Sequence, residues 1–213
     1  MEKPKEALTK GNQAIDQHDY DQAILHFTRA IEIDKNYAAA YIRRAYAYSC
    51  KDDYDHTIED CNRAIALRPT DVGYYQTRGD AYCCKGEYDR AIDDYTRGIQ
   101  IGPATDHTYC GRGYAYHMKL EHRRAIVDFN KAIGINPKHI RAYNGRATAF
   151  SALGDFAKAF SDFDKSIDID PWYGDTYAYR ATLYFSQKEY VKAMEDVRKA
   201  YKLGGRRDRK SVV

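Results

Sequence analysis

The chain has 213 residues, and its 34 Lys and Arg against 31 Asp and Glu leave a net charge of only +3. Because the two signs are interleaved, the balance argues against nucleic acid as a partner. We expect no membrane association, since no apolar run is long enough to cross a bilayer and the N-terminus lacks the hydrophobic stretch of a signal peptide. Five cysteines without such a peptide suit a reducing compartment, so we expect thiols and a cytoplasmic location.

From Pro4 onward the same 34-residue unit is repeated six times without insertion or deletion. The units span 4–37, 38–71, 72–105, 106–139, 140–173 and 174–207. A strict internal period of this length predicts stacked supersecondary units, each packed only on its neighbours. We therefore expect one continuous array over residues 1–207, followed by a basic C-terminal tail at 208–213.

Each unit contains two runs with helical spacing. In the third unit Tyr75, Gly79 and Tyr82 are four and three residues apart, and a second run begins after Lys85-Gly86-Glu87. A proline follows the second run and disfavours helix at the residue before it. It recurs at Pro69, Pro103, Pro137 and Pro171. The sequence therefore predicts an all-α chain of helix-turn-helix units.

Two further sets of residues recur with the period. Small residues recur where the paired helices must approach closely. In the first helix these are Gly11, Ala45, Gly79, Gly113, Ala147 and Ala181. Tyrosines recur as well, at Tyr41, Tyr75, Tyr109, Tyr143 and Tyr177. A tyrosine stripe can serve as a stacking platform for bases or sugars, but its period favours burial of the rings against the partner helix.

This pattern of Tyr, Gly or Ala, Tyr, then Ala, Tyr or Phe, Ala and Pro at fixed offsets resembles the tetratricopeptide repeat family over nearly the whole chain. The resemblance implies an α-solenoid in the form of a right-handed superhelix, with the first helices lining a concave groove. It also implies a non-enzymatic scaffold that binds peptide segments or partner helices.

The chain departs from the family where such repeats often carry leucine, because five units have arginine there. Each of these units also has an aspartate sixteen residues later on the second helix, whereas the first unit has Lys10 and His26. We predict a structural ladder of pairs within units, since a half-buried guanidinium needs a partner. The pairs are Arg44 with Asp60, Arg78 with Asp94, Arg112 with Asp128, Arg146 with Asp162, and Arg180 with Asp196. The alternative is a row of groove cations that binds an acidic ligand or RNA.

The remaining face of the first helices is the one that looks into the groove in this family. The candidate peptide-binding residues on it are Asn12, Tyr46, Gln76, Asp80, Tyr114, His117, Met118, Asn144, Thr148, Thr182 and Phe185. The face combines amides and hydroxyls with apolar anchors and carries little net charge, so we expect a weakly charged peptide or helix as the partner. Most of the lysine, asparagine and arginine clamp that some relatives use for chaperone C-terminal tails is missing, which argues against that ligand.

A third hypothesis is a metal or thiol-redox module in the third and fourth units. Its candidate ligands are Cys83, Cys84, His107, Cys110 and His117. Their spacing matches no zinc finger or ribbon, so we expect no metal and no cofactor. The sequence also has no Gly-rich phosphate loop, zincin pattern or nucleophile elbow, and we expect no enzymatic activity.

The C-terminal unit has features of its own. Leu203-Gly204-Gly205 is expected to end the last helix. The apolar Val191, Met194, Val197 and Tyr201 would then leave part of that helix uncovered, which predicts self-association through this end.

Overall fold

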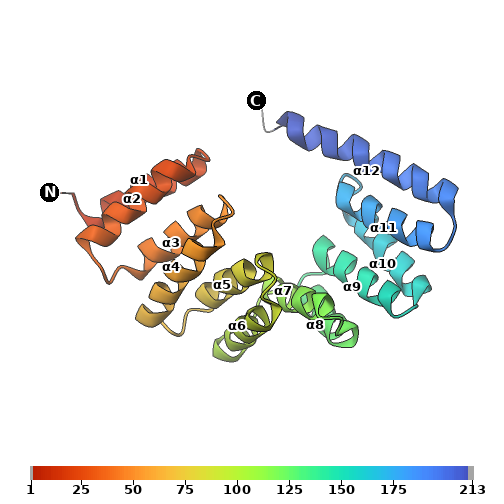
Figure 1. The fold of residues 1–213 in the computed structure, drawn as a ribbon, viewed down its shortest axis with the longest axis horizontal. Helices are drawn as coiled ribbons and strands as arrows, with labels where there is room; N and C mark the ends of the chain where they lie inside the picture. The colour runs from red at the N-terminus through yellow and green to blue at the C-terminus, as the bar shows by residue number, and fades with distance from the viewer. Residues whose placement is uncertain (1, 211–213) are drawn as a thin grey trace. The chain divides into compact units, whose positions relative to one another are not determined.

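The structure, a computed structural model, describes residues 2–210 and the side-chain surroundings of residues 2–204. Between residues 2 and 210 it consists of twelve helices without a β-strand, which confirms the all-α prediction (Figure 1). The helices are α1 Pro4–Asp16, α2 Tyr20–Ile33, α3 Ala38–Ser49, α4 Tyr54–Leu67, α5 Val72–Cys84, α6 Tyr88–Ile101, α7 Asp106–Met118, α8 His122–Ile135, α9 Ile140–Ala152, α10 Phe156–Ile169, α11 Gly174–Ser186 and α12 Tyr190–Lys210. Each odd-numbered helix pairs with the one that follows it.

The chain forms two compact bodies. The N-terminal body comprises residues 1–104 and contains α1 to α6, and the C-terminal body comprises residues 105–213 and contains α7 to α12. The boundary lies one residue before the junction of the third and fourth sequence repeats, so each body holds three helix pairs.

The helices end at residues that recur with the 34-residue period. The second helices end at Leu67, Ile101, Ile135 and Ile169, each two residues before a proline, as the sequence predicts. Within every pair the turn has one residue with positive φ. These residues lie 34 apart, at His18, Asp52, Gly86, Leu120, Gly154 and Lys188. Only two of the six are glycine, although a left-handed conformation costs other residues about 1–2 kcal/mol.

Within a pair, the small residues of the first helix meet a large side chain of the second. A Cβ added to Gly79 would lie 3.0 Å from the ring of Tyr95, and one added to Gly11 would lie 2.4 Å from the ring of Phe27. Both rings are almost fully buried. A larger residue at either glycine would push the helices apart, which explains why the period retains Gly or Ala there.

Within a body, each first helix packs against both helices of the preceding pair. In the N-terminal body α3 contacts α1 and α2, and α5 contacts α3 and α4. In the C-terminal body α9 contacts α7 and α8, and α11 contacts α9 and α10. Among the described residues, by contrast, no Cα atoms of consecutive second helices come within 8 Å of one another. Because consecutive first helices of a body approach one another, we call them its inner row.

The last helix differs from the sequence-based expectation. Instead of ending at Leu203-Gly204-Gly205, α12 continues to Lys210. Glycine costs a helix only about 1 kcal/mol, and no proline follows to end it. Residues 211–213 of the predicted tail lie outside the described residues. No helix within residues 2–210, α12 included, combines the length and apolar character that a bilayer span requires.

Candidate functional site

The five arginines of the ladder each bind the aspartate of their own repeat through two nitrogens. In the second repeat Arg44 donates from Nε and Nη2 to the two carboxylate oxygens of Asp60, both at 2.8 Å. In the third, Arg78 donates to Asp94 at 2.8 and 2.6 Å. The same bidentate geometry joins Arg112 to Asp128, Arg146 to Asp162 and Arg180 to Asp196. This fork geometry fixes how the first helix sits along the second.

Burial sets the electrostatics of these pairs. The aspartate side chains are only 4–9 % exposed and the arginine side chains 17–20 %. Burial raises the pKa of Asp94 even though the bonded Arg78 opposes that shift, while the bond to Asp94 raises the pKa of Arg78. In this pair the desolvation opposes the attraction between the two charges, so we expect the pair to specify the helix register more than to add stability.

A third bond from each of four arginines crosses to the preceding repeat, which the sequence analysis missed. Arg78 donates from Nη1 to Oδ1 of Asn62 at 2.6 Å, sixteen residues before it. The same contact joins Arg44 to Thr28, Arg146 to Asn130 and Arg180 to Asp164. The sequence does contain a signal, since a short oxygen-bearing side chain recurs every 34 residues from Thr28 to Asp164.

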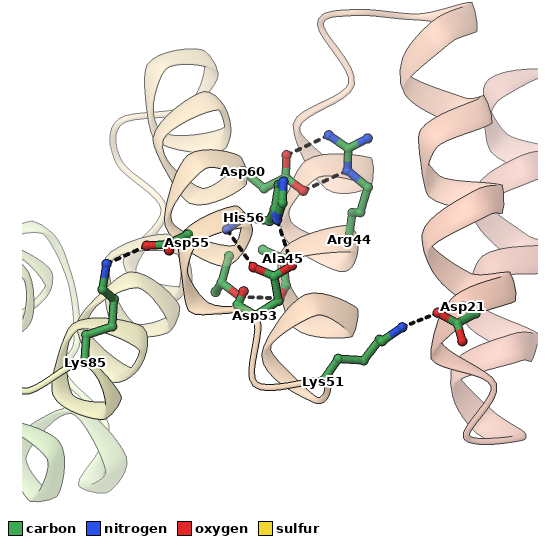
Figure 2. A network of polar contacts seen from close by, with 10 residues as sticks. Asp21, Arg44, Ala45, Lys51, Asp53, Asp55, His56, Asp60 and Lys85 are labelled. Carbon is green, nitrogen blue, oxygen red and sulfur yellow. Dashed lines mark hydrogen bonds and ion pairs between the residues drawn. The ribbon is translucent and has the colours of Figure 1, made fainter.

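Lysines provide a second set of links between repeats in the N-terminal body. Figure 2 shows Lys51 reaching Asp21 of the preceding repeat and Lys85 reaching Asp55, thirty residues away in each case. The Lys85 contact measures 2.5 Å. These partners are more exposed than the arginine pairs, so we expect each contact to contribute little to stability.

The inner row of the N-terminal body exposes one large aromatic among the candidate residues. Tyr46 on α3 is 47 % exposed. Asn12 on α1 has a buried Oδ1 with no hydrogen-bond partner among the described residues. Asp80 on α5 accepts a 2.6 Å bond from the hydroxyl of the buried Tyr95, so that carboxylate is partly engaged within its own repeat. Gln76 is half-buried on the same helix.

The inner row of the C-terminal body exposes Tyr114, Met118 and Phe185. The hydroxyls of Thr148 and Thr182 bond to carbonyls of their own helices, at Gly145 and Ala178. These three are the exposed large apolar side chains among the candidate residues of this row.

Asn144 does not lie on the exposed wall, contrary to the sequence-based expectation. It is 3 % exposed, and its Nδ2 donates at 2.9 Å to Thr176 of the next repeat. Thr176 in turn contacts Ser166. Here the repeat period places a polar residue at a contact between first helices, where it packs against its neighbour instead of facing a ligand.

The cysteines and histidines do not assemble into a larger cluster. Among the described residues, no three His, Cys, Asp or Glu side chains come together in a way that could hold a metal ion. His117 lies with its Nδ1 3.2 Å from Nδ1 of His122, and burial lowers the pKa of His117. Burial raises the pKa of Cys83 to about 11, so this thiol is protonated at neutral pH. Cys110 is buried, and Cys84 is exposed.

Comparison with protein families links this geometry to one family. Models described as tetratricopeptide repeat match residues 8–72, 106–139 and 140–171, and a model described as TPR repeat matches residues 79–119. No curated protein sequence matches the chain.

Solved structures share the fold at low sequence identity. A crystal structure of MamA aligns with a TM-score of 0.70 and 24 % identity, covering 79 % of this chain and 92 % of that one. The TPR protein YrrB aligns with a TM-score of 0.63 and 22 % identity over 83 % and 91 % of the two chains. A tetratricopeptide repeat protein from Parabacteroides merdae aligns with a TM-score of 0.80 and 21 % identity over 93 % and 79 %. With repeat models matching most of its length, the chain belongs to the tetratricopeptide repeat family.

Proposed function

We propose that this protein is a non-enzymatic scaffold that binds a weakly charged peptide segment or partner helix on the inner row of first helices. The observation that carries the proposal is the contrast between two kinds of aromatic residue. The tyrosines that recur with the period pack within the array, as Tyr75, Tyr143 and Tyr177 do. The aromatics that break the period, Tyr46 and Phe185, are exposed on the inner row. Exposed aromatic side chains on rigid helices are the usual anchors of a protein interface.

YrrB, which has the same fold, is described as a TPR protein with an unusual peptide-binding site. That likeness supports peptide binding as the general class of function here. The five cysteines, all thiols in the structure, suit a reducing compartment, and we place the scaffold in the cytoplasm.

The acidic-ligand or RNA hypothesis is the weaker alternative. Its cations would be the ladder arginines, yet each guanidinium already forms a bidentate pair with a buried carboxylate. To bind phosphate, such an arginine would have to leave an aspartate buried and unpaired, at a cost of about 3–5 kcal/mol.

Selection from a library of random peptides displayed on phage tests the proposal. We expect the full chain to enrich peptides with apolar anchors and little net charge. Their affinity should change little with salt, since few counterions are released. Enrichment of strongly acidic peptides, or affinity for RNA oligonucleotides that falls steeply with salt, would instead support the alternative.

A further inference from the structure

The pair α11 and α12 leaves an apolar groove open at the C-terminal end of the C-terminal body. The groove has a volume of about 590 Å³. Its lining includes Ala181, Ala193 and Val197, which we call the floor, together with Phe185, Met194 and Tyr201. Val197 is 49 % exposed and Tyr201 84 %. A monomeric protein rarely exposes so many large apolar side chains on one helix without a partner.

The repeats themselves show what covers this face elsewhere. The place of Val197 is taken in the earlier repeats by residues that are at most 1 % exposed, namely Phe27, Cys61, Tyr95, Phe129 and Phe163. In the fifth repeat the corresponding floor of Ala147, Ala159 and Phe163 is filled by Leu183 of the next first helix. The open groove therefore has the shape of a site for one more helix.

Charge specifies which helix the groove accepts. An incoming first helix brings a small or apolar residue, then an arginine four residues later, then an apolar residue three residues after that. In α11 these three are Thr176, Arg180 and Leu183. The arginine donates to the preceding second helix, where Asp164 accepts it at 2.6 Å. The equivalent of Asp164 on α12 is Arg198. A helix that docks here must therefore carry a negative charge at the place where α11 carries Arg180.

A second copy of the chain does not fit this reversed pattern. The α1 helix of a second copy has Glu6, Lys10 and Gln13 at the positions equivalent to Thr176, Arg180 and Leu183 of α11. Two polar residues would then lie on the apolar floor, and Lys10 would face Arg198. Two copies of α12 would also repel each other, because this helix carries eight Lys and Arg against three Asp and Glu.

We propose that the groove between α11 and α12 docks a helix of another protein with a small or apolar residue at position i, a carboxylate at i+4 and an apolar residue at i+7. The carboxylate pairs with Arg198, and the exposed Lys202 one turn further on favours a second acidic residue. The i and i+7 side chains fill the groove floor. The groove shares Phe185 with the inner row. Val197 and Arg198 belong to the second helix α12, however, and the proposal does not rest on peptide binding on the inner row.

The test uses two hydrocarbon-stapled helical peptides with the sequence of α11, residues 174–186. One keeps Arg180 and the other carries Arg180→Glu. Their affinities for the full chain are measured by fluorescence anisotropy. We expect the Glu peptide to bind at least about tenfold more tightly than the Arg peptide, since like charges at an interface are strongly unfavourable. Arg198→Glu should invert that preference. Arg198→Asn restores the acceptor found at Asn62 and Asn130 and should favour the Arg peptide.

Val197→Asp tests the apolar floor. It should lower the affinity of the chain for both peptides, while circular dichroism should show an unchanged helix content. The proposal is wrong if neither peptide binds, or if the Arg198 variants leave the ratio of affinities unchanged. It is also wrong if sedimentation shows a dimer that Val197→Asp dissociates and the Glu peptide cannot displace. In that case a second copy is the occupant.

Discussion

Arg146 donates from Nη1 to Oδ1 of Asn130 at 2.6 Å, across the boundary between the fourth and fifth repeats. The same side chain holds Asp162 within its own repeat through two further bonds. One arginine thus sets both the register within a helix pair and the contact with the preceding pair.

The Arg146 and Asp162 pair should contribute more to specificity than to stability. We expect Arg146→Met alone to lower the free energy of unfolding by about 3–5 kcal/mol, because Asp162 is left buried without its partner. The double variant Arg146→Met with Asp162→Leu should lie close to wild type. Urea denaturation of the two single variants and the double variant measures this, and a double variant as unstable as Arg146→Met would refute it.

The close approach of helices at Gly145 should make even one methyl group costly. A Cβ there would lie 2.4 Å from Cζ of Phe129. We therefore expect Gly145→Ala to destabilise the protein by about 1–3 kcal/mol despite the better helix propensity of alanine. The matched control is Gly134→Ala in α8, where no atom lies within 4 Å of the added Cβ. It should stabilise by about 0.5–1 kcal/mol, so equal effects at the two sites would contradict the packing argument.

The turn between α7 and α8 is predicted to be strained at Leu120. This residue has φ of 63° where the fifth repeat has Gly154 with φ of 80°. The side chain of Leu120 is largely exposed and contributes little burial. Leu120→Gly should therefore raise the unfolding free energy by about 1 kcal/mol. The reverse change, Gly154→Leu, should lower it by a similar amount in thermal denaturation. A loss of stability in Leu120→Gly would show that the turn is unstrained.

His139 should make the C-terminal body less stable in mild acid. Its Nδ1 accepts a bond from the Ala142 amide at the start of α9, which a protonated ring cannot do. Burial lowers the pKa of His139, and Arg141 and His107 act in the same direction while Asp106 opposes them. Because the unfolded pKa is about 6.5, this stability is present above that pH and is lost as the pH falls below it.

His139→Asn provides the matched comparison, since asparagine caps a helix without titrating. The urea midpoint of the wild type should fall more than that of the variant between about pH 7.5 and pH 5.5. Parallel changes in the two proteins would exclude His139 as the cause.

The sequence predicted the features that depend on periodicity. The helix pairs, the proline ends of the second helices and the small residues opposite large rings all recur every 34 residues, so six copies reinforce one another. It did not predict the bond from Arg146 to Asn130, because the acceptor position varies among Thr, Asn and Asp from repeat to repeat and so shows no charge that recurs with the arginine. It also misplaced Asn144, whose burial depends on how far α9 and α11 overlap, and it ended α12 too early because glycine alone does not stop a helix.

The central claim is that the inner row of first helices binds the partner, and substitutions of Tyr46 and Tyr114 test it most directly. Isothermal titration of a phage-selected peptide against Tyr46→Ala and Tyr114→Ala should show at least one affinity reduced by tenfold or more, as expected for an aromatic anchor. Leu25→Ala and Val127→Ala, which remove exposed aliphatic side chains from second helices, should bind like the wild type. Unchanged affinity in both tyrosine variants, or a loss confined to Leu25→Ala or Val127→Ala, would contradict the proposed site.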